Sequence, residues 1–400
     1  MVEKPTTIDL FCGAGGITEG FREAGFQCLF ANDMNEHAMA TFYANHPSAM
    51  VALASVEDLE PDLIRQRLGL RLGDLDCLVG GPPCQGFSIN APDRFLDDPR
   101  NSMFRHYVRF VDEFQPKTLL IENVPGMLSL AGGLVAKQIL RELVRRGYAV
   151  SYRILFAAHY GVPQERWRLI ILGSRLGCEI QHPSPITYAT ARANFTGGRS
   201  LIYKLHPTDC GRLPSAPNVK QAIGDLPGIG PGGGAERMDY DRAPASAYAC
   251  AARAGSEAVF NHVAPRIASV NLERLRYIKP GGSWRDIPHD LLPSGMQRAR
   301  RSDHTRRYGR LHPDGLSGTV MTKIDPHWGP AFHFEQDRTL TVREAARLQS
   351  FPDRYRFLGP RGAQYEQVGN AVPVLMAKAI AGSIRGALSS QYQTSDAAAG

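Results

Sequence analysis

The alternation of short apolar runs with helix-like stretches over residues 1–175 constrains the fold of this chain most strongly. Several of the runs are apolar at every position, which is typical of strands that are covered on both faces of a sheet. Amphipathic stretches separate the runs, and this alternation predicts an α/β fold with a doubly wound parallel sheet. The predicted strands are Thr7–Phe11, Cys28–Ala31, Met50–Ala54, Asp76–Val79, Thr118–Ile121, Arg153–Ala157 and Leu169–Leu172.

A glycine-rich turn follows the first predicted strand, with the sequence Phe11-Cys12-Gly13-Ala14-Gly15-Gly16. Glycines allow a tight turn and let a ligand approach the backbone, and the N-terminus of the helix behind them favours negative charge. The second predicted strand leads to Asp33, whose carboxylate would accept hydrogen bonds from ribose hydroxyls. The pattern indicates a nucleoside-cofactor site, with a plain tight turn as the alternative because the spacing is not the full G-x-G-x-x-G.

Cys84 lies on a polar turn after the fourth predicted strand, and Pro82 and Pro83 precede it. Ligands of open α/β sheets bind at the carboxyl ends of strands, so we interpret this cysteine as a nucleophile, although a lone cysteine is usually a small buried hydrophobic residue. The strand Thr118–Ile121 brings Glu122 to the same edge, where a carboxylate beside a nucleophile indicates proton transfer. Without Cys84, a surface glutamate would be the better interpretation.

A further polar segment, Gln164–Arg168, precedes the last predicted strand. Alternation along an extended segment places Gln164, Arg166 and Arg168 on one face. These three side chains are candidates for the same site, and the alternative is an ordinary solvated strand edge.

The net charge of +7 is confined to one part of the chain. Residues 176–318 hold 19 Lys and Arg against 12 Asp and Glu, and the rest of the chain is balanced. This segment is rich in Pro and Gly, and its run Arg298–Arg310 carries six arginines against one aspartate. A charge run is usually a solvated surface, but a basic module beside a neutral one favours a polyanion partner, which we interpret as DNA.

Composition excludes several other classes of protein. The seven cysteines are scattered without a C-x-x-C pair, which argues against a disulfide framework and a structural zinc site and favours a reducing cytosol. No stretch approaches twenty apolar residues and the N-terminus lacks an apolar signal region, so we expect neither a transmembrane helix nor a secretory signal. The expected location is therefore the cytoplasm.

Taken together, these segments resemble the DNA cytosine-5 methyltransferase family of prokaryotic restriction–modification type, and six motifs occur in the family's order between residues 6 and about 388. The resemblance implies a Rossmann-like S-adenosylmethionine-dependent methyltransferase domain over residues 1–180 and 325–400. It also implies a smaller, irregular target-recognition domain over residues 181–324. The motifs are Phe11–Gly16, Pro82-Pro83-Cys84, Glu122-Asn123-Val124, Gln164-x-Arg166-x-Arg168, Arg343–Pro352 and Gln367-x-Gly369-Asn370-Ala371-Val372-Pro373.

The resemblance implies a reaction with S-adenosylmethionine as cofactor, S-adenosylhomocysteine as product and no metal. Double-stranded DNA is the implied substrate. The chain is expected to be a monomer that associates with the nucleoid through DNA. It is expected to function together with a cognate restriction endonuclease, without forming a stable complex with it. Family chemistry assigns the Cys84 thiolate to C6 of a flipped-out cytosine and Glu122 to its N3. Arg166 is expected to hold the cytosine O2, and Arg168 to brace the Cys84 loop or bind a phosphate.

The resemblance also implies binding residues. Met34 is expected to pack on adenine, and Ser55 stands where the family often carries an aspartate at the adenine amino group. The expected cofactor residues are Phe11, Gly13, Gly15, Gly16, Asp33, Met34, Ser55, Val56, Pro82, Asn370 and Val372. The expected DNA contacts are Ser88, Arg298, Arg300, Arg301, Arg306 and Arg307.

Three alternatives are weighed against this interpretation. An RNA cytosine-5 methyltransferase of the same architecture would have a much shorter insert before the last two motifs. A non-catalytic DNA-binding relative would lack Cys84, Glu122 or Arg166, and all three are present. A nicotinamide-dependent oxidoreductase would explain the glycine turn and Asp33, but neither the cysteine turn nor the basic insert.

Overall fold

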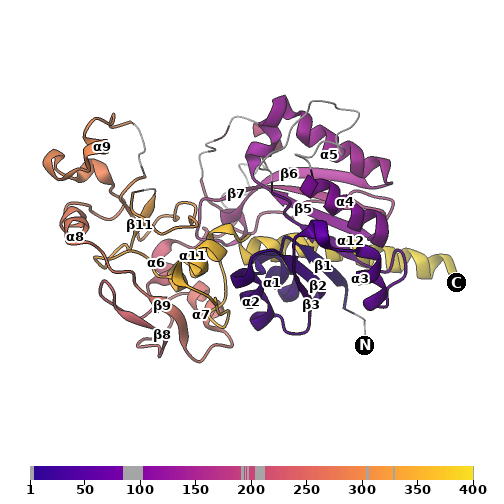
Figure 1. The fold of residues 1–400 in the computed structure, drawn as a ribbon, viewed down its shortest axis with the longest axis horizontal. Helices are drawn as coiled ribbons and strands as arrows, with labels where there is room; N and C mark the ends of the chain where they lie inside the picture. Colours follow the sequence, from indigo (N-terminus) through magenta and orange to yellow (C-terminus); the bar gives the residue numbers. More distant parts are fainter. Residues whose placement is uncertain are drawn as a thin grey trace. The chain divides into compact units, whose positions relative to one another are not determined.

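The computed structural model describes residues 4–83, 102–190, 193, 195, 198–202, 212–302, 306–327 and 329–399. The described residues form two compact units (Figure 1). We call them unit 1 and unit 2. Unit 1 comprises Met1–Tyr160, Trp167–Pro214 and Val372–Gly400, and unit 2 comprises Gly161–Arg166 and Ser215–Ala371. The units do not coincide with the predicted domains, since the main segment of unit 2 begins at Ser215 and ends at Ala371. The assignment of residues 181–324 to DNA recognition stays a prediction.

Among the described residues, unit 1 contains a seven-stranded sheet in the order β3-β2-β1-β4-β5-β7-β6. The doubly wound, mainly parallel fold is confirmed, because the order reverses beside β1 and β2–β1–β4–β5 run parallel. The strands are β1 (Thr6–Leu10), β2 (Gln27–Asp33), β3 (Met50–Leu53), β4 (Cys77–Gly80), β5 (Thr118–Asn123), β6 (Ala149–Phe156) and β7 (Trp167–Ser174).

One strand of the sheet departs from the predicted parallel arrangement. β7 pairs antiparallel with both β5 and β6. The reason is the connection between β6 and β7, residues 157–166, which contains only the short helix η5 (Ala157–Tyr160). A parallel pair needs a crossover of about a dozen residues or more, usually with a full helix, so this connection returns the chain in the opposite direction.

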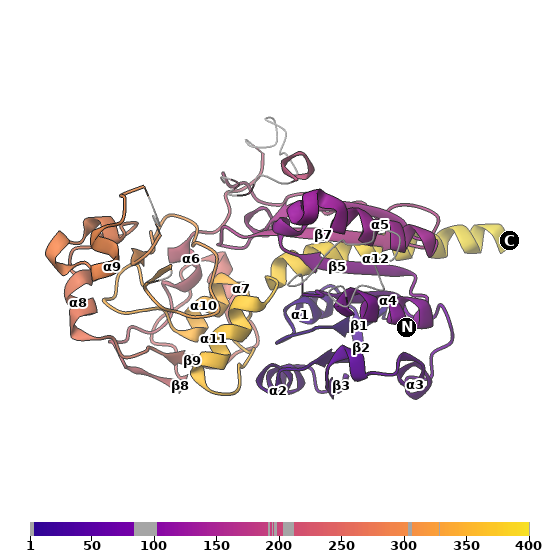
Figure 2. The same ribbon diagram turned by 45° about the horizontal axis from the view of Figure 1, so that its top comes forward.

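Helices cover both faces of the sheet (Figure 2). The apolar core on one face combines alternate strand residues, Ile8, Leu78 and Leu119 among them, with side chains of α3, α4 and α5. The next residue along β1, Asp9, faces the other side, where Thr18 of α1 contacts it. The helices of unit 1 are α1 (Gly16–Glu23), α2 (Glu36–Asn45), η1 (Val56–Asp58), α3 (Pro61–Arg67), α4 (Ser102–Phe114), η4 (Pro125–Gly133), α5 (Leu134–Arg145), η6 (Arg199–Leu201) and α12 (Val374–Ala399).

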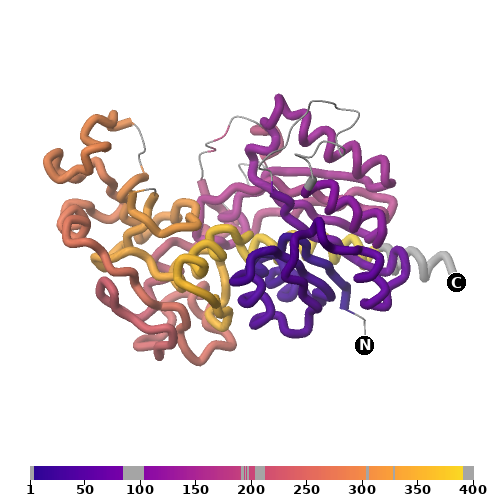
Figure 3. The backbone as a smooth tube through the Cα atoms, in the orientation of Figure 1, coloured from indigo at the N-terminus to yellow at the C-terminus, as the bar shows by residue number. Residues whose placement is uncertain are grey.

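The C-terminal helix α12 returns to lie beside α1 near the start of the chain (Figure 3). The two helices approach closely at Gly20, where an added Cβ would lie 2.5 Å from the Cβ of Ala377. Among the described residues, one stretch, Arg361–Ser390, has the length and apolar composition of a membrane-spanning helix, and 56% of its most apolar window is buried within the protein. A core helix has the same properties, and the packing of α12 on α1 is that of a core helix.

Unit 2 is built from short elements joined by loops. Its described strands form two small sheets, β8–β9 and β10–β11, and α10 packs against α6, α11 and β9 (Figure 2). The elements are α6 (Val219–Ile223), β8 (Gly234–Met238), α7 (Ala247–Arg253), β9 (Val259–Val263), α8 (Ser269–Leu275), η7 (Trp284–Asp286), η8 (His289–Leu291), α9 (Ser294–Gln297), β10 (Gly309–Arg310), β11 (Pro330–Phe332), α10 (Val342–Leu348) and α11 (Arg361–Asn370).

Candidate active site

The register of the sheet aligns the carboxyl ends of four parallel strands. Leu10 of β1 lies opposite Asn32 of β2 and Gly80 of β4, and Gly80 lies opposite Ile121 of β5. The residues that follow this row, among them Phe11 and Glu122, therefore share one edge of the sheet. The strand order reverses beside β1 at this edge, which is where open α/β sheets bind ligands.

The glycine turn adopts a backbone that suits a ligand. Phe11, Gly13 and Gly15 all have positive φ angles, of 57°, 52° and 87°. The N–H of Gly13 donates to a carboxylate oxygen of Asp33 at 2.9 Å, and the N–H of Asn35 donates to the other oxygen at 2.9 Å. These bonds fix the carboxylate beside the turn. A Cβ at Gly13 would have no heavy atom within 4 Å, so the turn leaves open space there.

Two further predicted cofactor residues lie next to these. Met34 is 76% exposed, which is unusual for an apolar side chain of this size and leaves its surface available to a flat ligand. Ser55 begins η1, and its hydroxyl accepts a long hydrogen bond of 3.4 Å from the N–H of Glu57. Val56 is buried beneath it. The side chain of Asn32 donates to the carbonyl of Ala54 at 3.0 Å and so ties this loop to β2.

A partly buried ion pair joins two of the predicted catalytic residues. The Nε of Arg168 lies 2.5 Å from a carboxylate oxygen of Glu122, and both side chains are less than 15% exposed. The antiparallel pairing of β5 with β7 makes this contact, because Asn123 lies opposite Leu169 and Arg168 is the next residue. A Cβ at Gly81 would come within 3.2 Å of the other carboxylate oxygen, so the chain leading to Cys84 passes directly beside Glu122.

Asn123 is a site residue whose motif is visible in the sequence but whose role is not. Its amide nitrogen donates to the carbonyl of Pro82 at 2.9 Å, and its carbonyl oxygen accepts from the N–H of Val124 at 2.9 Å. The side chain is buried. It therefore fixes the backbone at Pro82, two residues before Cys84, and the signal for this role was its position next to Glu122.

Arg166 and Gln164 belong to unit 2 and have a different environment from Arg168. Arg166 is 2% exposed, and its guanidinium donates to the carbonyl of Gly369 at 2.9 Å. The amide nitrogen of Gln164 donates to Gln349 and to the carbonyl of Leu348, each at 2.9 Å. These bonds tie the Gln164–Arg166 segment to the last two motifs. The expected role of Arg166 at the cytosine O2 stays a prediction.

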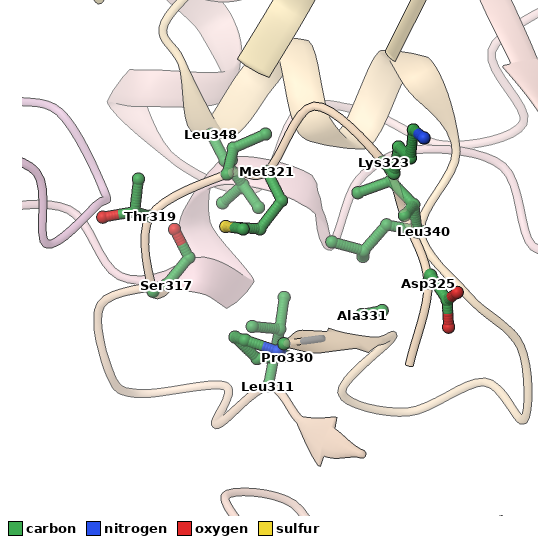
Figure 4. Close-up of a pocket in the computed structure, with 14 residues that line it drawn as sticks. Leu311, Ser317, Thr319, Met321, Lys323, Asp325, Pro330, Ala331, Leu340 and Leu348 are labelled. Carbon is green, nitrogen blue, oxygen red and sulfur yellow. The ribbon is translucent and has the colours of Figure 1, made fainter. Parts of the chain in front are cut away.

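The position of Gly369 leaves no space for a side chain. A Cβ there would lie 2.6 Å from backbone atoms of Met321 and Thr322. The same segment lines a narrow apolar cavity between Met321, Leu340 and Leu348 (Figure 4). The cavity has room for about one water molecule, so it is not a candidate ligand site.

The remaining predicted residues fall into three groups. Cys84 and Ser88 lie outside the described residues. Val372 is buried in unit 1, whereas Asn370 is exposed at the end of α11 in unit 2. In the arginine run, Arg298, Arg300 and Arg301 are exposed, Arg307 is partly exposed, and Arg306 is half-exposed and paired with Glu165.

Asp9 is a buried carboxyl group that the sequence patterns do not reveal. It is fully buried on β1, and its Oδ2 accepts a hydrogen bond of 2.6 Å from the hydroxyl of Thr18. Burial raises the pKa of Asp9 from 3.8 to about 7, the Thr18 bond opposes this shift, and the charge of Asp33 adds to it. No spacing distinguishes this aspartate from the apolar residues of its strand. Within the described part of the chain, no cluster of His, Cys, Asp and Glu could hold a metal ion.

Comparison with known proteins gives the same assignment over nearly the whole chain. The model of the C-5 cytosine-specific DNA methylase family matches residues 5–386. The chain belongs to this family. It is therefore a DNA methyltransferase with the fold of the enzymes that use S-adenosylmethionine.

Named relatives cover almost the full length of the chain. The type II methyltransferase M.AgeI of Thalassovita gelatinovora is 36% identical over 96% of this chain and 100% of its own. The type II methyltransferase M1.HphI of Haemophilus parahaemolyticus is 35% identical over 95% of this chain and 86% of its own. A prophage-encoded protein of E. coli, described as a proposed DNA modification methyltransferase, superimposes with a TM-score of 0.70 at 25% identity over 96% of this chain and 99% of its own.

Proposed function

We propose that this chain methylates C5 of a target cytosine in double-stranded DNA, with S-adenosylmethionine as methyl donor, and protects host DNA in a type II restriction–modification system. The observation that carries the proposal is the partly buried Glu122–Arg168 pair beside the chain segment that leads to Cys84. The match to the family over residues 5–386 supports the substrate class. The names of the relatives M.AgeI and M1.HphI support the restriction–modification role.

The cofactor is assigned to the carboxyl edge of unit 1. S-Adenosylmethionine supplies an electrophilic methyl group. Asp33 would accept the ribose hydroxyls, Met34 would pack on adenine, and the turn Phe11–Gly16 would leave room for the amino-acid part. The open space at Gly13 and the fixed carboxylate of Asp33 fit these roles. The further residues assigned to this site are Ser55, Val56, Pro82, Asn370 and Val372.

Cys84 is assigned to covalent catalysis on a cytosine that has left the base stack, since C5 cannot be reached inside a duplex. Addition of the thiolate to C6 moves electron density to C5, and Glu122 at N3 stabilises the charge that develops on the ring. C5 would then take the methyl group from the sulfonium sulfur, and the broken sulfur–methyl bond would leave S-adenosylhomocysteine as the second product. Loss of the C5 proton and cleavage of the C6–S bond restore the double bond of the product and the thiolate of the enzyme.

Arg168, rather than Arg166, is assigned to the cytosine O2. A guanidinium has five N–H donors, so Arg168 can hold the Glu122 carboxylate and a base carbonyl oxygen together. Arg166 is enclosed by unit 2 and bonds a backbone carbonyl, so its role is to position the motif. Arg168→Lys should therefore lower kcat by at least about tenfold, because the planar guanidinium that orients Glu122 is lost.

The direct test is methyl transfer from labelled S-adenosylmethionine to duplex DNA of mixed sequence, followed by bisulfite sequencing. We expect 5-methylcytosine at one short recurring sequence. Cys84→Ala should abolish transfer and retain DNA binding, whereas the control Cys178→Ala, at an exposed cysteine of unit 1, should leave both unchanged. Transfer to RNA alone would move the chain to the RNA alternative, and a Cys84→Ala variant with normal turnover would contradict the assignment of the nucleophile.

The partners are proposed as follows. The enzyme acts as a monomer in the cytoplasm, associates with the nucleoid through DNA, and needs no stable complex with its restriction endonuclease or a metal. Sedimentation at working concentration should give the mass of one chain, and added chelator should leave methyl transfer unchanged. Arg298, Arg300, Arg301, Arg306, Arg307 and Ser88 are the assigned contacts to the DNA backbone.

A further inference from the structure

Glu165 places a negative charge among the basic residues of unit 2. It stands between Gln164 and Arg166, and its carboxylate pairs with the guanidinium of Arg306, which lies 141 residues further along the chain. The Glu165 side chain is 33% exposed and the Arg306 side chain is 50% exposed. The pair therefore lies at the surface, where solvent or another polyelectrolyte can reach it.

The backbone of Glu165 is fixed on both sides by the segment that follows the arginine run. Its N–H donates to the carbonyl of Ser317 at 2.8 Å, and its carbonyl accepts from the hydroxyl of Thr319 at 2.8 Å. The neighbouring Gln164 side chain accepts from the N–H of Val320 at 3.1 Å. The carboxylate is consequently attached to a rigid backbone, not to a loop that follows the movements of Arg306.

Arg306 is held on a second side by a glycine. A Cβ at Gly318 would come within 3.1 Å of Nη1 of Arg306, so the guanidinium lies against the backbone there. The contacts with Glu165 and Gly318 restrict the orientation of the side chain while half of it remains exposed. An arginine ordered in advance loses less conformational entropy when its exposed donors bind a planar anion or a phosphate.

Stability alone gives a weak reason for this pair, because a surface ion pair contributes only about 0–1 kcal/mol. We propose that Glu165 is a positioning residue that holds Arg306 ready to bind one phosphate of the DNA backbone, and that its charge limits the affinity of this surface for non-specific DNA. The inference rests on the proposed function, since it names DNA as the anion. It assigns Glu165, an acidic residue, to DNA recognition.

The salt dependence of DNA binding tests the first half of this inference. Each phosphate contact contributes about 0.9 to the slope of log K against log salt concentration, which is roughly 3.5-fold in affinity between 50 and 200 mM salt. Arg306→Ala should lower the slope by about 0.9. Arg306→Lys keeps the positive charge and should keep the slope. It loses the planar guanidinium that Glu165 orients, so DNA binding should be weaker at every salt concentration.

The sign of the Glu165→Gln effect tests the second half. An amide keeps an oxygen acceptor for Arg306 but removes the negative charge, so non-specific DNA should bind several-fold tighter while the slope stays within the error of the wild-type value. The matched control is the exposed pair Arg242–Asp241 in the same unit, whose side chains are 51% and 47% exposed. Arg242→Ala should leave the salt slope unchanged, and Asp241→Asn should leave the affinity for non-specific DNA unchanged.

Two results would overturn the inference. If the Arg306→Ala variant melts at a lower temperature but keeps the wild-type salt slope, the Glu165–Arg306 pair only stabilises the fold and does not contribute to DNA binding. A Glu165→Gln variant that binds non-specific DNA more weakly contradicts the role of the charge. Wild-type protein that fails to methylate or bind DNA overturns the proposed function instead, and that result is seen before any variant is made.

Discussion

Both compact units bury an apolar cluster, but they differ in the charged residues that are buried beside it. In unit 1 the main cluster is apolar, with Ile8, Leu78 and Leu119 at 0% exposure between the sheet and its helices. In unit 2 the residues around α10 are charged and equally buried. Arg338 pairs with Glu344, and Arg347 pairs with Asp353, all at 0–1% exposure.

Buried ion pairs explain how an irregular unit can hold one conformation. Apolar contacts depend little on direction, whereas each buried ion pair requires one partner in one geometry. Burial would raise the pKa of Glu344, but the charge and hydrogen bonds of Arg338 outweigh burial and hold it well below its usual range. Arg347 also bonds Asp225, and Tyr240 donates to Asp353 at 2.6 Å. We therefore expect unit 2 to be sensitive to loss of one charge, and unit 1 to loss of volume.

The largest effect is expected from Arg347→Met, which keeps much of the side-chain volume and leaves two buried carboxylates without their central partner. Breaking a buried pair in this way costs about 3–5 kcal/mol. Urea denaturation of the variant should show this loss in the free energy of unfolding. Arg242→Met, at the exposed pair with Asp241, is the control and should cost less than about 1 kcal/mol. Equal losses in the two variants would remove the distinction between the cores.

The second effect is expected in unit 1. Leu119→Ala removes a fully buried side chain between the sheet and its helices and should cost about 2–5 kcal/mol through lost burial and a residual cavity. Since no charge is involved, the loss should be the same at pH 5 and pH 8 and at low and high salt. A loss that varied with salt would show that the apolar description of this core is incomplete.

The third effect concerns the close contact of α1 and α12. Gly20→Ala would place a Cβ 2.5–2.7 Å from Ala377, Val374 and Lys378, and overpacking of this kind costs about 1–3 kcal/mol. Gly382→Ala on α12 has no heavy atom within 4 Å of the new Cβ and should stabilise the helix by up to about 1 kcal/mol. Thermal unfolding should show a lower melting temperature for Gly20→Ala and a higher one for Gly382→Ala. This difference between two glycine-to-alanine substitutions would establish that close packing determines the change in stability. Two stabilising results would contradict the contact.

The sequence predicted the strands of unit 1 well because buried strands are marked by continuous apolar runs. The direction of β7 was missed, since direction follows from the geometry of the residue 157–166 connection and not from the composition of the strand. The boundary at residue 325 stays a prediction, and unit 2 extends beyond it to Ala371. The buried arginines of α10 bond partners in unit 2, such as Asp225 and the carbonyl of Phe260.

The candidate site shows the same limit. The glycine turn, Asp33 and Glu122 were predictable because spacing relative to a strand end fixes their place at one edge. The difference between Arg166 and Arg168 was not, because alternation puts both on one face and only the pairing of β7 with β5 brings Arg168 to Glu122. Asn123 was missed because its role is a bond to the backbone of Pro82, which no spacing rule describes.

The last prediction compares the pH dependence of stability in the two units. The buried carboxyl of Asp9 has its pKa raised from 3.8 to about 7, so between these values the folded protein binds a proton that the unfolded chain has lost. Its contribution to stability therefore falls by about 1.4 kcal/mol for each pH unit from pH 4 to pH 7. Asp353 has a lowered pKa, because its bonds to Arg347 outweigh burial. Its contribution is constant above about pH 5 and is lost only as the pH falls below about 4.

Asp9→Asn should remove this dependence. The free energy of unfolding of the variant, taken relative to that of the wild type, should therefore rise from pH 5 to pH 7. Thr18→Val removes the hydroxyl whose hydrogen bond holds down the pKa of Asp9, so this variant should extend the fall in stability to higher pH. Urea denaturation at several pH values measures both variants. A difference that is constant with pH would mean that Asp9 does not titrate in this range, and the contrast in pH response between the two cores would then be lost.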